Sequence, residues 1–535
     1  MKYFPSDITT EYSVVKENNL AIQLYGKRIH ESQTVGEYLL EFLLVFSGTN
    51  RGEGGLASEK NLKGKVPYVV NPNIGLKRFV FLENSKSINR YKADVTANSK
   101  LNEIIMDLII SEYFTPEQIL QILKDLFYGF NLITKQRGWF AQSMIPLCRD
   151  LIFCDAMGNK SEREKLNYFD KENDCKDTIS KQLDKGFGFK QHNFLARGGE
   201  MYFLHLLQGL IEFEEQTSKE DAQNMRTTLE RGIFSMLDAF PQLEVLSKFI
   251  QGSWENYIED KISNKDELQS KGTSIRDYLS EEMECEWVKE SYKDIAVYAI
   301  KELRTILSSD INEFDKLEMV NIGIILNIFR IMTREAYRVS TDEKEGKPIW
   351  LIHVPSISGG DEKIKKLAVL HYNLLENYMT TAIYKQHEIR SLLVEGKMTK
   401  EEIIKDLRNA YDDSHKLLRK IGKEIGLIIP PTGASMRFSM SDSIVRYLVI
   451  SMVEPMTSIT LDRFMEKIYN YYGIVIREKE FTNHENLIDG QEIYAPYLKY
   501  NFESFTIQLK ANGFLKELSD ATAIVSNPYE KTEDI

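Results

Sequence analysis

A long run of helical patterns is the feature that most constrains how this chain can fold. From Ser99 to about Ile425, apolar residues recur three and four positions apart, which places them on one side of successive α-helices. Two helix starts are well marked, because Thr115 with Gln118 and Thr399 with Glu402 match the reciprocal capping pattern. We therefore expect a mainly α protein with a multi-helix body at residues 96–425.

The first 95 residues predict a small mixed α/β region. A helix is expected over Thr34–Phe46, with Thr34 and Glu37 forming a capping box at its start. Four short runs predict strands: Tyr12–Val15, Ala21–Leu24, Val66–Val70 and Arg78–Leu82. Pro67 lacks a backbone donor, so the strand that contains it is expected at a sheet edge.

The C-terminal part of the chain predicts three helices and a hairpin after a linker. Two prolines and two glycines interrupt the helical pattern in residues 426–440, which we interpret as the linker. The predicted elements that follow are helices at Ser443–Val453, Leu461–Tyr472 and Tyr500–Asn512 and strands at Phe514–Leu518 and Ala521–Val525. This order is typical of a winged helix-turn-helix, so we expect a winged-helix domain at residues 441–535.

A DNA-binding winged helix would place the third of these helices, Tyr500–Asn512, in the major groove. Helical spacing predicts that Asn501, Ser504 and Gln508 lie on its exposed face, where they can read base edges. Lys499, Lys510 and Lys516 are the nearby cations that can meet phosphates. However, the stretch from Ser441 to Val525 has a net charge of −4, so a solvated or protein-facing helix surface is an equal alternative.

Charge is distributed unevenly along the chain, which has a formal net charge of −12. The stretch from Gly48 to Lys92 holds nine basic and three acidic residues, a net charge of +6. It is therefore the better candidate for phosphate contact, through Lys60, Lys63, Lys65, Lys77 and Arg78. Its glycine-rich loop lacks the GxxxxGK spacing of a phosphate-binding loop, so we interpret that loop as a surface connection.

The sequence holds no recognisable catalytic or metal-binding motif. HExxH and GxSxG are absent, and the four cysteines have no CxxC spacing, so we expect no metal and no cofactor. A possible anion site is Arg197-Gly198-Gly199, followed by Glu200, at the start of an apolar helix. The favoured interpretation there is an arginine–carboxylate pair with glycines that allow close helix packing.

Targeting features are also missing from the sequence. No run approaches eighteen apolar residues, and the first fifteen residues include acidic side chains without an apolar core. We expect no membrane span, no secretory signal and a cytoplasmic location.

Two stretches resemble a family of bacterial proteins. YGKRIHESQTVGEYLLEFLLVF at Tyr25–Phe46 and the C-terminal SDSIVRYLVISMVEP, LDRFMEKIYNYYGIVI and FTIQLKANGFLKELSDATAIV are similar to helper subunits of anti-phage defence systems of the DNA-modification-associated type. The resemblance implies a cytoplasmic subunit that works beside an ATPase, nuclease or methyltransferase encoded elsewhere. It carries over no catalytic residue.

Three functions follow from these observations. The first is a non-enzymatic subunit of a multi-protein bacterial defence complex, which scaffolds other protein subunits and contacts double-stranded DNA or protein through its winged helix. The second is a DNA-binding transcriptional regulator. The third is a nuclease-type enzyme whose site is assembled from distant residues, for example around Arg197 and Glu200.

Overall fold

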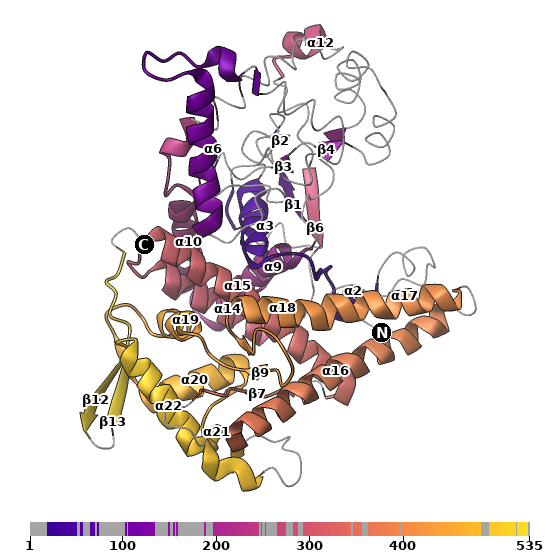
Figure 1. The fold of residues 1–535 in the computed structure, drawn as a ribbon, viewed down its shortest axis with the longest axis vertical. Helices are drawn as coiled ribbons and strands as arrows, with labels where there is room; N and C mark the ends of the chain where they lie inside the picture. The colour runs from indigo at the N-terminus through magenta and orange to yellow at the C-terminus, as the bar shows by residue number, and fades with distance from the viewer. Residues whose placement is uncertain are drawn as a thin grey trace. The chain divides into compact units, whose positions relative to one another are not determined.

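The chain is mainly helical, as predicted, and its strands are short (Figure 1). The structure is a computed structural model that describes residues 19–50, 54–56, 65–69, 72–73, 102–103, 105–133, 148–149, 154–155, 157–158, 187–188, 196–245, 248, 252, 265–273, 282–286, 293–343, 346–355, 362–394, 398–482, 492–519 and 522–532. The predicted strands at Tyr12–Val15 and Arg78–Leu82 lie outside these residues.

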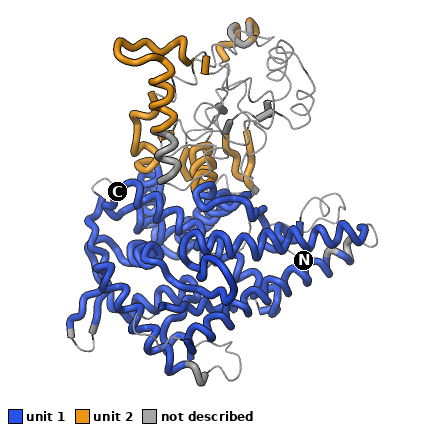
Figure 2. Tube along the Cα trace, in the orientation of Figure 1, with its two compact units in different colours: residues 1–38, 195–233, 288–535 blue, residues 39–194, 234–287 orange. Residues whose placement is uncertain are grey.

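The chain divides into two compact units (Figure 2). Unit 1 consists of residues 1–38, 195–233 and 288–535, and unit 2 consists of residues 39–194 and 234–287. The helical span and the C-terminal region, which the sequence predicted as separate domains, both contribute most of their described helices to unit 1.

Five long helices build the centre of the helical span: α9 (Gly198–Gln216), α10 (Lys219–Leu237), α14 (Lys293–Leu307), α15 (Glu313–Thr341) and α16 (Glu362–Val394). The Asn312 side chain caps α15 by accepting from the amide of Asp315, and nineteen residues of this helix are buried. Helices α9 and α14 approach very closely, because a Cβ at Gly209 would lie 2.3 Å from the Ala296 carbonyl oxygen.

A helix interrupted by a π-turn follows α16 in the chain. It consists of α17 (Lys400–Tyr411), the π-turn η5 (Asp412–Lys416) and α18 (Leu417–Glu424). The predicted capping box at its start is confirmed, because Thr399 and Glu402 bond each other's backbone amides at 3.0 and 3.2 Å.

The N-terminal elements differ in part from the prediction. Helix α3 (Val35–Gly48) is present as expected, and the Glu37 carboxylate accepts from the Thr34 amide at 2.7 Å. The predicted strand at Ala21–Leu24 is wrong, because these residues lie in helix α2 (Leu20–Tyr25). Asn19 caps that helix through the Ile22 amide, and Gly26 ends it with a φ of 83°.

Unit 2 holds helix α6, the short helix α12 and several strand pairs. Helix α6 (Pro116–Ile133) begins with the predicted box, since the Thr115 amide donates to Gln118 at 3.0 Å. Strand β1 (Lys65–Val69) confirms the predicted strand and pairs antiparallel with β6 (Glu282–Glu286). The other elements are α12 (Lys265–Ser270) and the two-residue strands β2 (Pro72–Asn73), β3 (Cys154–Asp155), β4 (Met157–Gly158) and β5 (Phe187–Gly188).

The C-terminal region contains the three predicted helices and the predicted hairpin. The helices are α19 (Asp442–Met452), α20 (Leu461–Tyr472) and α22 (Leu498–Ala511), and the hairpin strands are β12 (Leu515–Ser519) and β13 (Thr522–Ser526). A further strand, β10 (Ser458–Thr460), pairs with β13 to give a three-stranded sheet of order β10-β13-β12. Between α20 and α22 the chain forms β11 (Ile474–Val475), α21 (Glu478–Thr482) and the 3-10 helix η6 (Glu492–Tyr497).

The segment predicted as a linker, 426–440, is instead part of the packed structure. It forms the strand pair β8 (Ile428–Ile429) and β9 (Arg437–Phe438), and the side chains of Leu427, Ile428 and Phe438 are buried. Its prolines and glycines break the helical pattern, but its apolar residues pack into unit 1.

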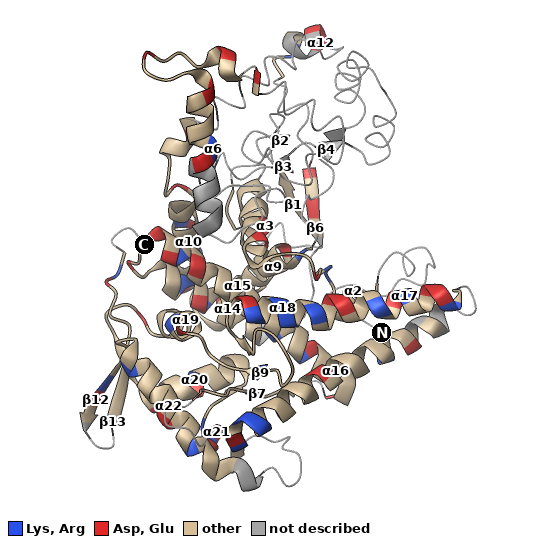
Figure 3. Cartoon of the chain, viewed as in Figure 1, with Lys and Arg blue, Asp and Glu red and all other residues tan. Residues whose placement is uncertain are grey.

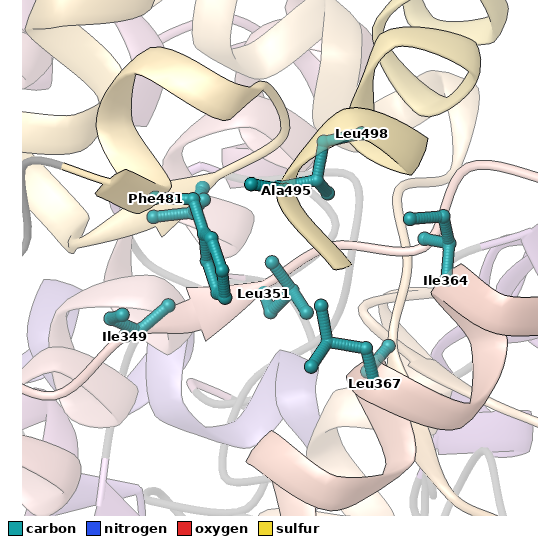
Figure 4. Close-up of a cluster of buried hydrophobic side chains, with 9 residues drawn as sticks. Ile349, Leu351, Ile364, Leu367, Phe481, Ala495 and Leu498 are labelled. Carbon is teal, nitrogen blue, oxygen red and sulfur yellow. The ribbon is translucent and has the colours of Figure 1, made fainter. Parts of the chain in front are cut away.

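One strand of the helical span pairs with a strand of the C-terminal region. Strand β7 (Trp350–Leu351) pairs in parallel with β11, and its neighbour Ile352 bridges to Phe438. A buried cluster joins the same parts of the chain (Figure 4): Ile349, Leu351, Ile364, Leu367, Ala368, Val475, Phe481, Ala495 and Leu498. The C-terminal helices and the helical span therefore share one hydrophobic core.

Candidate functional site

The outer side of α22 carries the most specific binding site that the sequence predicted. We call its exposed residues the α22 surface: Lys499, Tyr500, Glu503, Ile507 and Lys510. Tyr500 is 58% exposed and Ile507 is 55% exposed, although both residues have large hydrophobic side chains. Phe505 and Leu509 face the core, so α22 has the orientation that its apolar spacing predicted.

Asn501 does not lie on this surface, and its predicted exposure is wrong. Its side chain is 3% exposed and bonds three backbone groups of the core. The amide nitrogen donates to the carbonyl oxygens of Ile352 and Ile476, both at 2.9 Å, and its oxygen accepts from the Val354 amide at 2.8 Å. Because these bonds hold the segments that follow β7 and β11 against α22, Asn501 is not available to a base edge.

The other two residues predicted to read bases are also partly covered by the protein. Ser504 and Gln508 are half-buried. The Gln508 side chain donates to the Met440 carbonyl oxygen at 3.1 Å and to the Asp442 carboxylate at 2.9 Å. Asn512 donates to the same carboxylate at 3.0 Å, and these two bonds lower the pKa of Asp442. These amides anchor α22 to the start of α19.

The predicted phosphate contacts near α22 are few. Lys499 and Lys516 are exposed, but Lys510 forms an ion pair with Glu517 of the hairpin. Figure 3 shows acidic and basic residues interspersed along the C-terminal helices. Electrostatic attraction of a duplex to this surface is therefore weak.

The basic tract between Gly48 and Lys92 lies largely outside the described residues. Lys60, Lys63, Lys77 and Arg78 are all outside them. Lys65 begins strand β1, where its backbone lies opposite Glu286. The role predicted for these cations stays a prediction.

The structure places the predicted anion site at the start of α9. Arg197 precedes the helix, and its guanidinium lies 3.6 Å from the Glu200 carboxylate, which Lys27 also contacts at 2.8 Å. Gly198 allows close packing, since a Cβ there would lie 2.5 Å from the Tyr38 ring. Arg197 is thus paired with a buried carboxylate and Gly198 allows close packing, which agrees with the favoured interpretation.

A buried polar cluster that the sequence did not predict lies at the centre of unit 1. Arg330 of α15 donates to the Glu302 carboxylate at 3.1 Å and to the Asn327 side chain at 3.0 Å, and all three residues are buried. The Tyr447 hydroxyl contacts Glu302 at 3.3 Å and the Tyr472 hydroxyl at 3.2 Å. These partners come from helices far apart in the sequence, so no local motif marks the cluster.

The electrostatics of this cluster indicate a structural role. Burial raises the pKa of Glu302, while the charge of Arg330 and hydrogen bonds from three side chains oppose the shift. Nearby, burial and then the charge of Arg330 lower the pKa of His205 to about 3, so this histidine is neutral at physiological pH. The cluster connects α14, α15, α19 and α20 through buried polar side chains.

Unit 2 has an exposed apolar segment just before and within α6. Ile110 and Tyr113 are 96% and 87% exposed, and Leu108, Phe114 and Ile122 are each about half exposed or more. The Ser111 hydroxyl accepts from the amides of Tyr113 and Phe114 at 3.3 and 3.2 Å, which orders the turn that presents them. An exposed apolar group of this kind is typical of an interaction surface.

Metal-binding clusters and membrane-spanning helices are both absent from the part of the chain that the structure describes. Within it, histidine, cysteine and acidic side chains form no group of three or more that could hold a metal ion. Over the same residues, no helix combines the length and apolar character that crossing a bilayer requires.

Comparison of the chain with protein-family models, with curated proteins and with solved structures finds no match.

Proposed function

We propose that this chain is a non-enzymatic subunit of a multi-protein assembly and that its C-terminal region is a winged helix that binds a protein partner. The α22 surface carries this proposal. Tyr500 and Ile507 are exposed there, while Asn501 and Gln508, which a DNA-reading helix would present, bond the protein itself. Aromatic side chains such as Tyr500 are among the groups that supply most binding energy at protein interfaces, and an exposed aliphatic neighbour adds apolar area.

The topology of the C-terminal region supports the winged-helix assignment. Strand β10 lies between the first and second helices and pairs with β13, and β13 pairs with β12 after the third helix. The insertion of β11, α21 and η6 between α20 and α22 departs from the short connection of a helix-turn-helix. That insertion holds part of the core of unit 1, which favours a winged helix adapted for assembly.

The exposed apolar segment of unit 2 supports the scaffold part of the proposal. Ile110, Tyr113 and Phe114 form a second exposed apolar group in a different part of the sequence. A chain that works alone gains nothing from such surfaces, because they promote aggregation. A subunit with more than one partner uses them as contacts.

The nature of the partners is proposed from the resemblance of Tyr25–Phe46 and of the C-terminal stretch to helper subunits of bacterial anti-phage defence systems. On that basis the partners are other cytoplasmic subunits of a defence complex. The DNA-binding regulator and the nuclease-type enzyme are the competing proposals, and the experiment below separates all three.

The experiment is affinity purification of the full chain from its native host, with mass spectrometry and nucleic-acid recovery. We expect a stoichiometric protein partner that Ile507→Asp releases, because a charge at this position opposes burial of the surface. The matched control is Ile404→Asp, which changes an isoleucine of α17 that is 66% exposed. The partner should then bind the purified chain with an affinity that Ile507→Asp lowers at least about tenfold.

Two results would contradict the proposal. Recovery of DNA whose salt-sensitive binding weakens on Lys499→Ala and Lys510→Ala would favour the regulator. Metal-dependent cleavage of nucleic acid by the purified chain alone would favour the enzyme.

A further inference from the structure

Four basic side chains gather where α14 and α20 meet the end of α19 in unit 1. Lys301 and Arg304 lie one turn apart on α14, and Arg463 and Lys467 lie one turn apart on α20. The Lys467 ammonium donates to the carbonyl oxygen of Met452, the last residue of α19, at 2.7 Å. We call these four residues the basic cluster.

The contacts within the chain neutralise only part of this cluster. Arg304 forms an ion pair with Glu454, and Lys467 has the Met452 carbonyl. Lys301 lies over the Phe213 ring at 5.8 Å. Among the described residues, no carboxylate forms an ion pair with Lys301 or Arg463. Over the described part of the chain, Glu454 is thus the one carboxylate that forms an ion pair with these four cations, in a chain whose net charge is −12.

The four charges act on one another. Burial and then the positive charges of Arg463, Lys301 and Arg304 lower the pKa of Lys467, against the opposing charge of Glu454. Like charges one turn apart on a helix destabilise it, and here two such pairs face each other. A bound anion would offset this repulsion.

The surroundings hold the cluster in a fixed geometry. The rings of Tyr298 on α14 and Tyr471 on α20 stack with centroids 3.8 Å apart, one turn from Lys301 and Lys467 respectively. Lys301, Arg304 and Lys467 are half-buried, whereas Arg463 is exposed. The cations are thus positioned before any ligand arrives, and one side of the cluster remains open to solvent.

We infer that the basic cluster binds a phosphate group of a ligand. A phosphate offers several charged oxygens, which matches ammonium and guanidinium donors converging from two helices. The phosphate belongs either to a free molecule such as a nucleotide or to the backbone of a nucleic acid. This site is separate from the α22 surface, and the inference does not depend on the proposed protein partner.

The test uses the double variant Lys301→Gln/Arg463→Gln of the full chain. Isothermal titration with pyrophosphate, with ATP and with a short DNA duplex should show binding to the unmodified chain. The double variant should bind the same probe about tenfold more weakly or worse. The control is Lys400→Gln/Lys405→Gln, which removes the same charge from exposed positions of α17 and should bind normally.

The probe that binds identifies the source of the phosphate. Binding of pyrophosphate or ATP indicates a free phosphorylated molecule, and binding of the duplex alone indicates a nucleic-acid backbone. Ile507→Asp should leave this binding unchanged, which distinguishes the site from the proposed docking surface.

Thermal unfolding supplies a second readout. Because the double variant removes repulsion, its unliganded Tm should equal or exceed that of the unmodified chain. The inference is overturned if no probe binds, if the double variant binds as well as the unmodified chain, or if its unliganded Tm falls by several degrees.

Discussion

Glu335 makes the stability of unit 1 depend on pH through a single carboxyl group. Its side chain is buried on α15, where Arg338 donates to one oxygen at 2.8 Å. Burial raises the pKa of Glu335 to about 7, against the opposing charge of Arg338. A pKa that is higher in the folded state favours folding while the group is protonated. That contribution is complete below the unfolded pKa and is lost as pH rises through about 7.

Replacing this carboxyl should therefore flatten the pH dependence. In Glu335→Gln, the amide retains an acceptor for Arg338 and never ionises. We expect the variant to be more stable than the unmodified chain at pH 8, by up to roughly 3 kcal/mol, and similar to it at pH 5. Urea unfolding followed by circular dichroism across this range measures the difference. Parallel pH curves for the two proteins would show that Glu335 is not the group responsible.

The ion pair between Glu302 and Arg330 predicts an asymmetric response to substitution. Glu302→Leu should cost about 3–5 kcal/mol, because it leaves the Arg330 guanidinium buried without its carboxylate. The double variant Glu302→Leu/Arg330→Met should cost clearly less, since it removes both charges. The free energies of unfolding of the two single variants and the double variant form the required cycle. Additive losses would indicate that the two side chains do not depend on each other.

Helix packing at the level of whole elements depends on glycine where α9 meets α14. Gly209→Ala would place a methyl group 2.3 Å from the Ala296 carbonyl oxygen, which belongs to rigid helical backbone. We expect the two helices to be forced apart at a cost of about 1–3 kcal/mol. Gly252→Ala is the control, because none of the described residues lies within 4 Å of a Cβ there. Thermal unfolding should show a lower Tm for the first variant only, and equal Tm values would contradict the packing argument.

Elements whose signals are local were predictable, and those fixed by distant partners were not. The box at Thr399 and Glu402 and the helix at Leu461–Tyr472 follow from neighbouring residues and were confirmed. Strand β6 lies within the span that the sequence predicted as helical, and it was missed because its partner β1 lies more than two hundred residues earlier. The spacing of apolar residues predicted one buried face of α22. The segment around β7 packs on a second face of this helix, and Asn501 lies on that second face. The hydrogen bonds of the Asn501 side chain depend on that second face, so they could not be predicted from local spacing.

At the scale of the whole molecule, the C-terminal region depends on the helical span for its stability. The side chain of Asn501 bonds Ile352 and Val354, and Tyr447 bonds Glu302. Residues 527–532 add a further connection, because the amides of Asp310 and Thr532 bond the carbonyl oxygens of Glu530 and Ser308 at 2.8 and 3.0 Å. Removing the helical span would expose these polar groups and half of the cluster shown in Figure 4.

A fragment of residues 441–535 alone should therefore fail to fold cooperatively. In the intact chain, four residues of the shared cluster come from this fragment and pack on five from residues 349–368. Without those five, the fragment loses apolar burial worth on the order of 5 kcal/mol or more, comparable with the whole stability of a small domain. We expect a broad, noncooperative thermal transition by circular dichroism, whereas the intact chain should unfold cooperatively. A sharp and reversible transition for the fragment would mean that it is an autonomous domain, as its helix and strand pattern alone predicted.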